Sequence, residues 1–328
     1  MVNPAFALEQ ATPEEARKHF FEYSNSEQWN PSRNGYEFDL AVIKADPSAF
    51  WLGKLEEDDQ DEPGKKKKSI VYTVATAHYG DKQGWLGLHI LDKAHRGRGL
   101  GLQGFTEALK KFSPGAAVGL DGVMAQVKNY EKSGFVHHAW TNERRHGRIE
   151  DIFAKLDVNE AKHASRIVDT VKISGDRLKQ LWQVETEACG LDRPEFAEQW
   201  VRFHNGDEHR FGVAYLSEDH QTVLGYACVR PAVSSYRVGP LYAESEEIAA
   251  ALLASIGRKV LAAHEKKPLD GVQLAIDIDV PDKNKAAMAL FDRLGWPNTF
   301  PCARLWSGAG APKANVDHCF AVCSLEFG

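Results

Sequence analysis

The chain has 328 residues, 43% of them hydrophobic and 26% charged, which is enough for one large globular domain or two medium ones. Its formal net charge of −6 argues against a nucleic-acid partner, because phosphate binding usually needs a basic face. The N-terminal segment does not resemble a signal peptide, and no stretch has the roughly 18 apolar residues of a membrane span. The five scattered cysteines predict reduced thiols and no metal site. We therefore expect a cytoplasmic protein that neither spans a membrane nor contains disulfides.

The first half of the sequence predicts a helix and then a mixed sheet. Thr12 and Glu15 have the spacing of a capping box at a helix start. Apolar, β-branched and aromatic runs predict strands at 49–55, 69–79 and 84–91. The block at 56–69 between the first two strands is acidic and then lysine-rich, and it is typical of a solvated hairpin tip.

A helix and a further group of strands follow. The helix is predicted over 100–112, with one apolar stripe facing the sheet formed by Leu102, Phe105, Leu109 and Phe112. We expect a short helix at 125–133 and strands at 116–123, 134–140 and 148–154.

The second half repeats this order of elements after a polar stretch that predicts a linker over 158–169. Strands are expected at 169–173, 209–217, 222–230, 271–278 and in the closing segment up to 327, and helices at 175–188, 246–264 and 284–295. Because the same succession occurs twice, we predict two copies of one α/β (α+β) fold with mixed sheets, over residues 1–157 and 170–328.

The stretch AHRGRGLGLQGF, residues 94–105, joins the strand at 84–91 to the next helix. A helix start offers unpaired N–H groups and partial positive charge, and glycines let the backbone close around an anion, so this loop predicts a phosphate or pyrophosphate site. A Walker A loop is absent, and the glycine spacing is G-x-G-x-G where a dinucleotide fingerprint needs G-x-G-x-x-G. Two interpretations are left: a glycine-rich turn without function, and the pattern R-x-x-G-x-G of Arg96, Gly99 and Gly101.

The R-x-x-G-x-G pattern resembles the acyl-CoA loop of the GNAT superfamily of N-acetyltransferases, and NYEKSGF at 129–135 resembles the second GNAT signature, Y-x-K-x-G-F. The similarity extends over nearly the whole chain to a tandem-GNAT group whose second domain is divergent. The resemblance implies acetyl-CoA as co-substrate, no metal, and coenzyme contacts from Leu91, Arg96, Gly97, Arg98, Gly99, Leu100, Gly101 and Asn129.

Tyr130 stands where the family's tyrosine acts as the general acid that protonates the CoA thiolate. A phenol with a pKa of about 10 suits this leaving group, although a packed structural tyrosine is the alternative. The sequence departs from the family at Val123, where many relatives carry an asparagine that contacts the coenzyme, and Asn129 is not a direct replacement for it.

The second half lacks the features that bind coenzyme in the first. Its counterpart of the loop is RVGPLYAES at 237–245, which keeps only Gly239 and contains Pro240, a residue without an N–H group. Phe291 stands at the position of the catalytic tyrosine, although Asn284 keeps the asparagine that the first half lost. We therefore expect this half to shape the acceptor pocket or support the fold, with a second functional site as the alternative.

Weaker candidates complete the predicted site. His89 or Asp121 is expected to act as the base, unless His89 is a buried strand residue and Asp121 caps a turn. The loop at 29–34, with Trp29, Asn30 and Asn34, is expected to contact the acceptor, with a plain turn as the alternative.

The sequence thus predicts an N-acetyltransferase that moves an acetyl group to a primary amine of a small molecule, an amino acid or amine, by direct attack on the thioester. Transfer to a protein or peptide lysine, transfer of a longer acyl chain, and a CoA-binding sensor without turnover are the alternatives. The sequence predicts neither the identity of the acceptor nor the oligomeric state.

Overall fold

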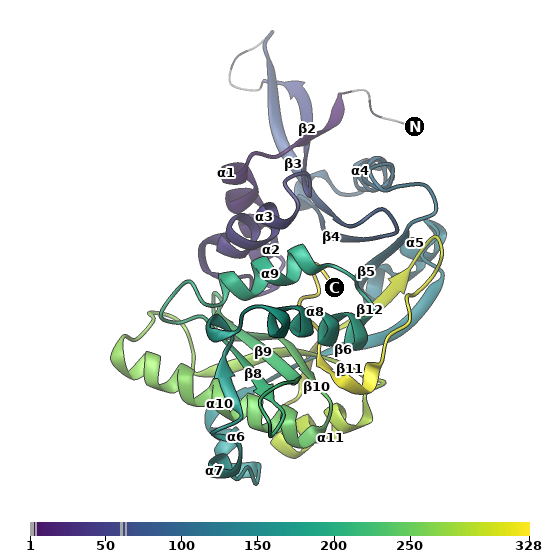
Figure 1. The fold of residues 1–328 in the computed structure, drawn as a ribbon. Helices are drawn as coiled ribbons and strands as arrows, with labels where there is room; N and C mark the ends of the chain where they lie inside the picture. Colours follow the sequence, from purple (N-terminus) through teal and green to yellow (C-terminus); the bar gives the residue numbers. More distant parts are fainter. Residues whose placement is uncertain (1–2, 4, 60–61, 63) are drawn as a thin grey trace.

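Strand pairing determines the architecture of the computed structural model, which describes residues 3, 5–59, 62 and 64–328. Within these residues one sheet has the strand order β1-β2-β3-β4-β5-β12-β6-β11-β10-β9-β8-β7, with β13 paired to β10 (Figure 1). The strands are β1 (Phe6–Gln10), β2 (Phe50–Asp58), β3 (Lys66–Tyr79), β4 (Gln83–Leu91), β5 (Ala117–Val123), β6 (His137–Arg148), β7 (Ile167–Asp169), β8 (Phe211–Leu216), β9 (Val223–Pro231), β10 (Tyr236–Ala243), β11 (Ala275–Pro281), β12 (Asn298–Trp306) and β13 (Cys319–Ala321).

Helices flank the strands of the sheet in both halves of the molecule (Figure 1). Those of the first half are α1 (Pro13–Glu15), α2 (Phe21–Ser26), α3 (Ile43–Ala45), α4 (Leu100–Leu109), α5 (Val127–Lys132) and α6 (Ile149–Lys155). Those of the second half are α7 (Glu160–His163), α8 (Asp176–Cys189), α9 (Pro194–Phe203), α10 (Glu246–Lys266) and α11 (Lys285–Leu294). No helix among the described residues has the length and apolar character needed to cross a membrane.

The two halves exchange one long strand each. In the second half of the chain, β12 leaves its own neighbours and lies between β5 and β6, while β6 of the first half lies between β12 and β11. Trp306 on β12 meets Trp85 on β4 edge to face, with ring centroids 5.5 Å apart and both side chains buried. Burying side chains of this size contributes about 1.5–3 kcal/mol each, so the shared strands bind the halves into one hydrogen-bonded and packed unit.

The structure confirms several local expectations. Thr12 and Glu15 form both bonds of the capping box at α1, and the charged block lies at the end of the β2–β3 hairpin. Residues 60, 61 and 63 of that block lie outside the described residues.

Three local expectations are wrong. The segment 169–173 is not a strand, because only Asp169 belongs to β7 and Thr170–Lys172 form a 3-10 turn. The segment 148–154 is not a strand, because it forms α6, in which Ile149 and Ile152 are buried one helical turn apart. Leu102 does not face the sheet, because α4 buries Leu100, Gly104, Phe105 and Ala108 and leaves Leu102 65% exposed. In addition, Pro194–Phe203 form α9, an amphipathic helix that was not expected from the sequence pattern.

Candidate active site

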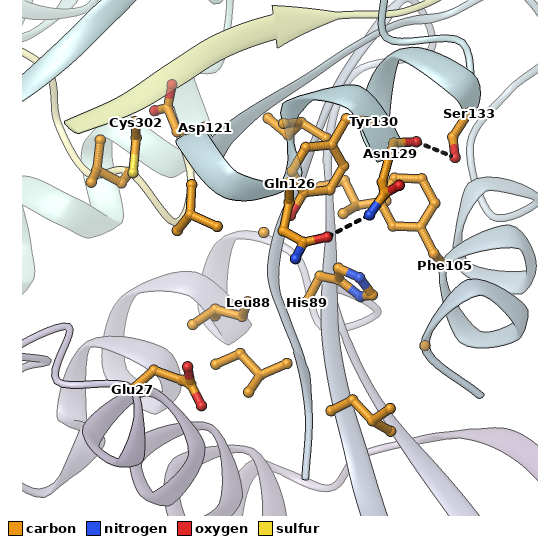
Figure 2. A pocket seen from close by; sticks show the side chains of 18 of the residues that line it. Glu27, Leu88, His89, Phe105, Asp121, Gln126, Asn129, Tyr130, Ser133 and Cys302 are labelled. Atoms are coloured by element: carbon orange, nitrogen blue, oxygen red, sulfur yellow. Dashed lines mark hydrogen bonds between the residues drawn. The ribbon is translucent and has the colours of Figure 1, made fainter. Parts of the chain in front are cut away.

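A gap between β4 and β5 forms the main cavity. These parallel strands pair only at Gln83–Trp85 with Ala117–Gly119. Beyond that point the register of β4 against β3 shifts and Leu88 adopts φ of +54°, a bulge that turns β4 away from its neighbour. The resulting cavity has a volume of about 790 Å³, and Figure 2 shows Tyr130, His89 and Phe105 gathered on one side of it and Asp121 beside Cys302 on another.

The glycine loop lies at the wall of this cavity and at the start of α4. Gly97 and Gly99 both have φ of +78°, a left-handed conformation that glycine adopts without strain. Gly99 is the N-cap of α4 and supplies no side chain to the first-turn N–H groups. A side chain at Gly97 or Gly99 would meet nothing within 4 Å, so the space beside the loop is open. This arrangement fits an anion such as a pyrophosphate.

The cavity brings together six of the predicted coenzyme residues and leaves out two. Leu91, Arg96, Gly97, Gly99, Gly101 and Asn129 line it. Arg96 is held there by Glu27, whose carboxylate accepts from its Nη2 at 2.7 Å. Arg98 instead donates to Glu57 at 2.8 Å on the β2 hairpin, and the Leu100 side chain is buried in the core, so neither lines the cavity.

Tyr130 projects from α5 into the cavity. Its ring lies 5.8 Å from that of Phe105 and 6.4 Å from that of His89. Gly122 on β5 makes room for the ring, because a Cβ there would lie 2.5 Å from Cε2 of Tyr130. Burial, with a smaller contribution from the Cys302 thiol, raises the pKa of Tyr130 above its usual value of 10. The phenol therefore stays protonated and has a proton to donate.

His89 lies on β4 in the same part of the cavity (Figure 2). Its Nδ1 is 2.7 Å from the Tyr72 hydroxyl. Burial lowers the pKa of His89 to about 4. The imidazole is thus neutral at neutral pH and accepts a proton only weakly, which argues against the role of general base.

Asp121 lies on β5 and faces Arg304 of the exchanged strand β12. Arg304 donates to both carboxylate oxygens, at 2.9 and 2.6 Å, and Asn142 donates to the first of them at 2.9 Å. Both partners of the ion pair are fully buried, and burial raises the pKa of Asp121 to about 6 in spite of Arg304. Because Asp121 already has these partners, its geometry is that of a link between the halves rather than of a free base.

The wall opposite the glycine loop is built mainly from parts of the chain that the sequence analysis left without a role. It contains Trp29, Arg144, Phe300, Cys302, Leu325 and Glu326. Of the predicted acceptor residues only Trp29 lies there. Asn30 donates to Ser235 and Asp277 of the second half at 2.8 and 2.6 Å, and Asn34 is exposed in a turn with φ of +60°.

The C-terminal tail reaches this wall from the second half. Trp85 Nε1 donates to the carbonyl oxygen of Leu325 at 3.2 Å. The Glu326 carbonyl lies so close to Gly87 that a Cβ at Gly87 would be 1.9 Å from it. The sequence predicted a closing strand through 327, but only Cys319–Ala321 pairs as β13. Only the lack of a side chain at Gly87, on a distant strand, marks this contact in the sequence.

In the second half, the gap that corresponds to the cavity is filled. There β10 and β11 are parallel and pair only at Tyr236–Val238 with Ile276–Ile278. The register of β10 then shifts, and β13 pairs with it at Leu241 and Tyr242 while Val322 N–H donates to Asp279 O on β11 at 3.0 Å. The helix that follows β10, α10, begins with Glu246 and Glu247 and is capped by Ser245, which makes its start unfavourable for an anion.

Comparisons with known proteins agree with this geometry. A family model described as an acetyltransferase (GNAT) domain matches residues 181–321, the second half. The chain is 26% identical over 307 residues to a holothin acyltransferase from a Pseudoalteromonas species, covering 94% of this chain and 90% of the relative. It is also 23% identical to an uncharacterized protein from Caenorhabditis elegans over 172 residues, 52% of this chain and 53% of the relative.

Solved structures show the same fold over the full length. A putative acetyltransferase from Pyrococcus horikoshii superposes with a TM-score of 0.70 at 19% identity, covering 100% of this chain and 98% of its own. A tandem GNAT protein from the clavulanic acid biosynthesis pathway superposes with a TM-score of 0.60 at 12% identity, covering 93% and 99%. Among the described residues no cluster of three or more His, Cys, Asp or Glu side chains could hold a metal ion. The second half of the chain therefore matches the GNAT acetyltransferase domain, and the whole chain has the fold of these two solved structures, one of which is a tandem GNAT protein.

Proposed function

We propose that the chain transfers the acetyl group of acetyl-CoA to a primary amine of a small molecule. The observation that carries this proposal is the open gap between β4 and β5, which leads to the start of α4, where no side chain caps the helix. The pyrophosphate would lie against Gly97, Gly99 and Gly101, and the pantetheine arm would run along Leu88–Leu91. A relative named for acyl transfer to holothin supports a small acceptor.

In the proposed reaction the neutral amine attacks the thioester carbonyl carbon, a C–N bond forms and the C–S bond breaks. The bulge at Leu88 turns peptide groups out of the ladder, so a backbone N–H of this segment can polarise the carbonyl oxygen. The CoA thiolate takes its proton from Tyr130, and the amine releases its extra proton to water. His89 and Asp121 hold their neighbours in place, since His89 bonds Tyr72 and Asp121 bonds Arg304.

The cavity favours a small acceptor over a basic peptide. Each carboxylate that lines the cavity already faces an arginine: Glu27 with Arg96, Asp121 with Arg304, and Glu326 with Arg237. A lysine-rich peptide carries several positive charges and would need several carboxylates without arginine partners, whereas a small amine needs only one carboxylate oxygen with room for a further hydrogen bond. Tyr130 is protonated and lies in the cavity close to the β4 bulge. This position supports a catalytically active enzyme rather than a CoA sensor.

We further propose one coenzyme per chain, because β13 occupies the second gap. Titration calorimetry of acetyl-CoA tests both points, with a thiol-release assay over amino acids, amines and short peptides to identify the acceptor. We expect a stoichiometry of one, and release of CoA with small amines. Absence of acetyl-CoA binding would refute the coenzyme assignment. Two sites per chain would refute the inference that β13 blocks coenzyme binding between β10 and β11.

A further inference from the structure

The C-terminal tail places one carboxylate on the acceptor side of the cavity. Glu326 lines the cavity, and 7% of its side chain is exposed. Its backbone lies against Gly87, next to the Leu88 bulge where the thioester carbonyl is proposed to bind. The tail thus carries a group from the second half to the reacting end of the coenzyme.

Arginines of both halves keep this carboxylate charged. Arg237 Nη1 donates to Oε1 at 2.9 Å, and the Ser324 hydroxyl donates to Oε2 at 2.5 Å. Burial alone would raise the pKa of Glu326, but the charges of Arg237 and Arg144 and the Ser324 bond together lower it to about 2. Each oxygen of a carboxylate accepts two hydrogen bonds, so both oxygens keep capacity for a further donor.

Apart from Arg144, the residues that line the same wall of the cavity as Glu326 are apolar. Trp29, Phe300, Cys302 and Leu325 line this wall, and the Arg144 guanidinium lies 5.4 Å from the centre of the Phe300 ring. Burial raises the pKa of the Cys302 thiol, so it lines the wall as a neutral group. A ligand that fits here has an apolar, flat body and one polar hydrogen-bond donor.

We propose that Glu326 binds the amine group of the acceptor, and that the acceptor is a small primary amine with a flat apolar body. The amine N–H groups donate to the carboxylate while the body packs on Trp29 and Phe300. This inference rests on the proposed function and narrows its substrate class.

The test compares benzylamine with benzyl alcohol, two probes of one shape that differ in the amine. Their affinities are measured by calorimetry on the full chain with saturating CoA, which cannot acetylate either. The charge-assisted hydrogen bond from benzylammonium to the carboxylate is stronger than the neutral O–H bond that benzyl alcohol donates, so we expect at least a tenfold preference for the amine in the wild-type protein. Glu326→Gln should abolish this preference and leave acetyl-CoA affinity unchanged.

Glu37→Gln is the matched control. Glu37 is buried, faces Arg230 at 3.4 Å, and does not line the cavity, and Arg230 is the cross-strand partner of Arg237. This variant should keep the tenfold preference. Equal preference in Glu326→Gln and Glu37→Gln would overturn the proposal.

The wild-type protein gives a second test that needs no variant, should Glu326→Gln fail to fold. A wild-type protein that binds acetyl-CoA but does not prefer benzylamine over benzyl alcohol overturns the role of Glu326 alone. A wild-type protein that does not bind acetyl-CoA overturns the proposed function itself.

Discussion

Replacing Gly101 with alanine should make the protein more stable and less able to bind acetyl-CoA. Gly101 is the second residue of α4 and lines the cavity. A Cβ there would have its nearest neighbours, Leu91 Cδ2 and His89 Cε1, at 3.7 and 3.8 Å, which is ordinary contact. Because alanine loses less backbone entropy than glycine in a helix, we expect a gain of about 0.5–1 kcal/mol in the free energy of unfolding. The same methyl group enters the proposed pyrophosphate site.

We expect calorimetry to show acetyl-CoA affinity reduced at least about tenfold, or about 1.4 kcal/mol, while thermal unfolding shifts upward by about 1–3 °C. Gly104→Ala, one turn further along α4, is the matched control. Its Cβ would lie 2.6 Å from the Tyr72 ring, so it should cost about 1–3 kcal/mol of stability. Unchanged acetyl-CoA affinity in a folded Gly101→Ala variant would refute the coenzyme site at this loop.

Three further results are expected. Tyr130→Phe should lower turnover by about two to four orders of magnitude while acetyl-CoA binding persists, and unchanged thiol release would remove Tyr130 from the reaction. Folding lowers the pKa of Glu326 from its usual 4.5 to about 2. Glu326 therefore contributes about 3 kcal/mol to the free energy of unfolding above pH 4.5, and this contribution is lost as the pH falls toward 2. Denaturant unfolding measured against pH should show this loss in the wild-type protein but not in Glu326→Gln. Arg304→Met leaves Asp121 buried without its ion pair and should cost about 3–5 kcal/mol in urea unfolding, part of which Asp121→Asn in the same chain should restore; additive losses would contradict the pairing.

The sequence was sufficient to predict those features that depend on residues close to one another in the chain. The loop at 94–105 and the signature at 129–135 could be identified because helix starts and glycine turns are local, and both lie at the cavity. The apolar pattern at 148–154 predicted a strand wrongly, because the spacing of Ile149 and Ile152 also fits a helix.

The wall of the cavity opposite the glycine loop could not be predicted, because it depends on contacts between distant parts of the chain. Glu326 reaches Gly87 from 239 residues away. The arginine partner of Asp121 arrives on β12 only because the halves exchange strands. No local pattern specifies either pairing, since both follow from the register of the whole sheet.

The position of β13 means that a coenzyme between β10 and β11 and Glu326 in the cavity of the first half exclude each other. The strand is held in the gap of the second half, and from that anchor the following residues extend to place Glu326 in the cavity of the first half. A coenzyme bound between β10 and β11 would have to displace this anchor and would withdraw the carboxylate from the acceptor. On the proposed assignment of the sites, the second copy of the fold binds no coenzyme and instead supports the acceptor site of the first copy.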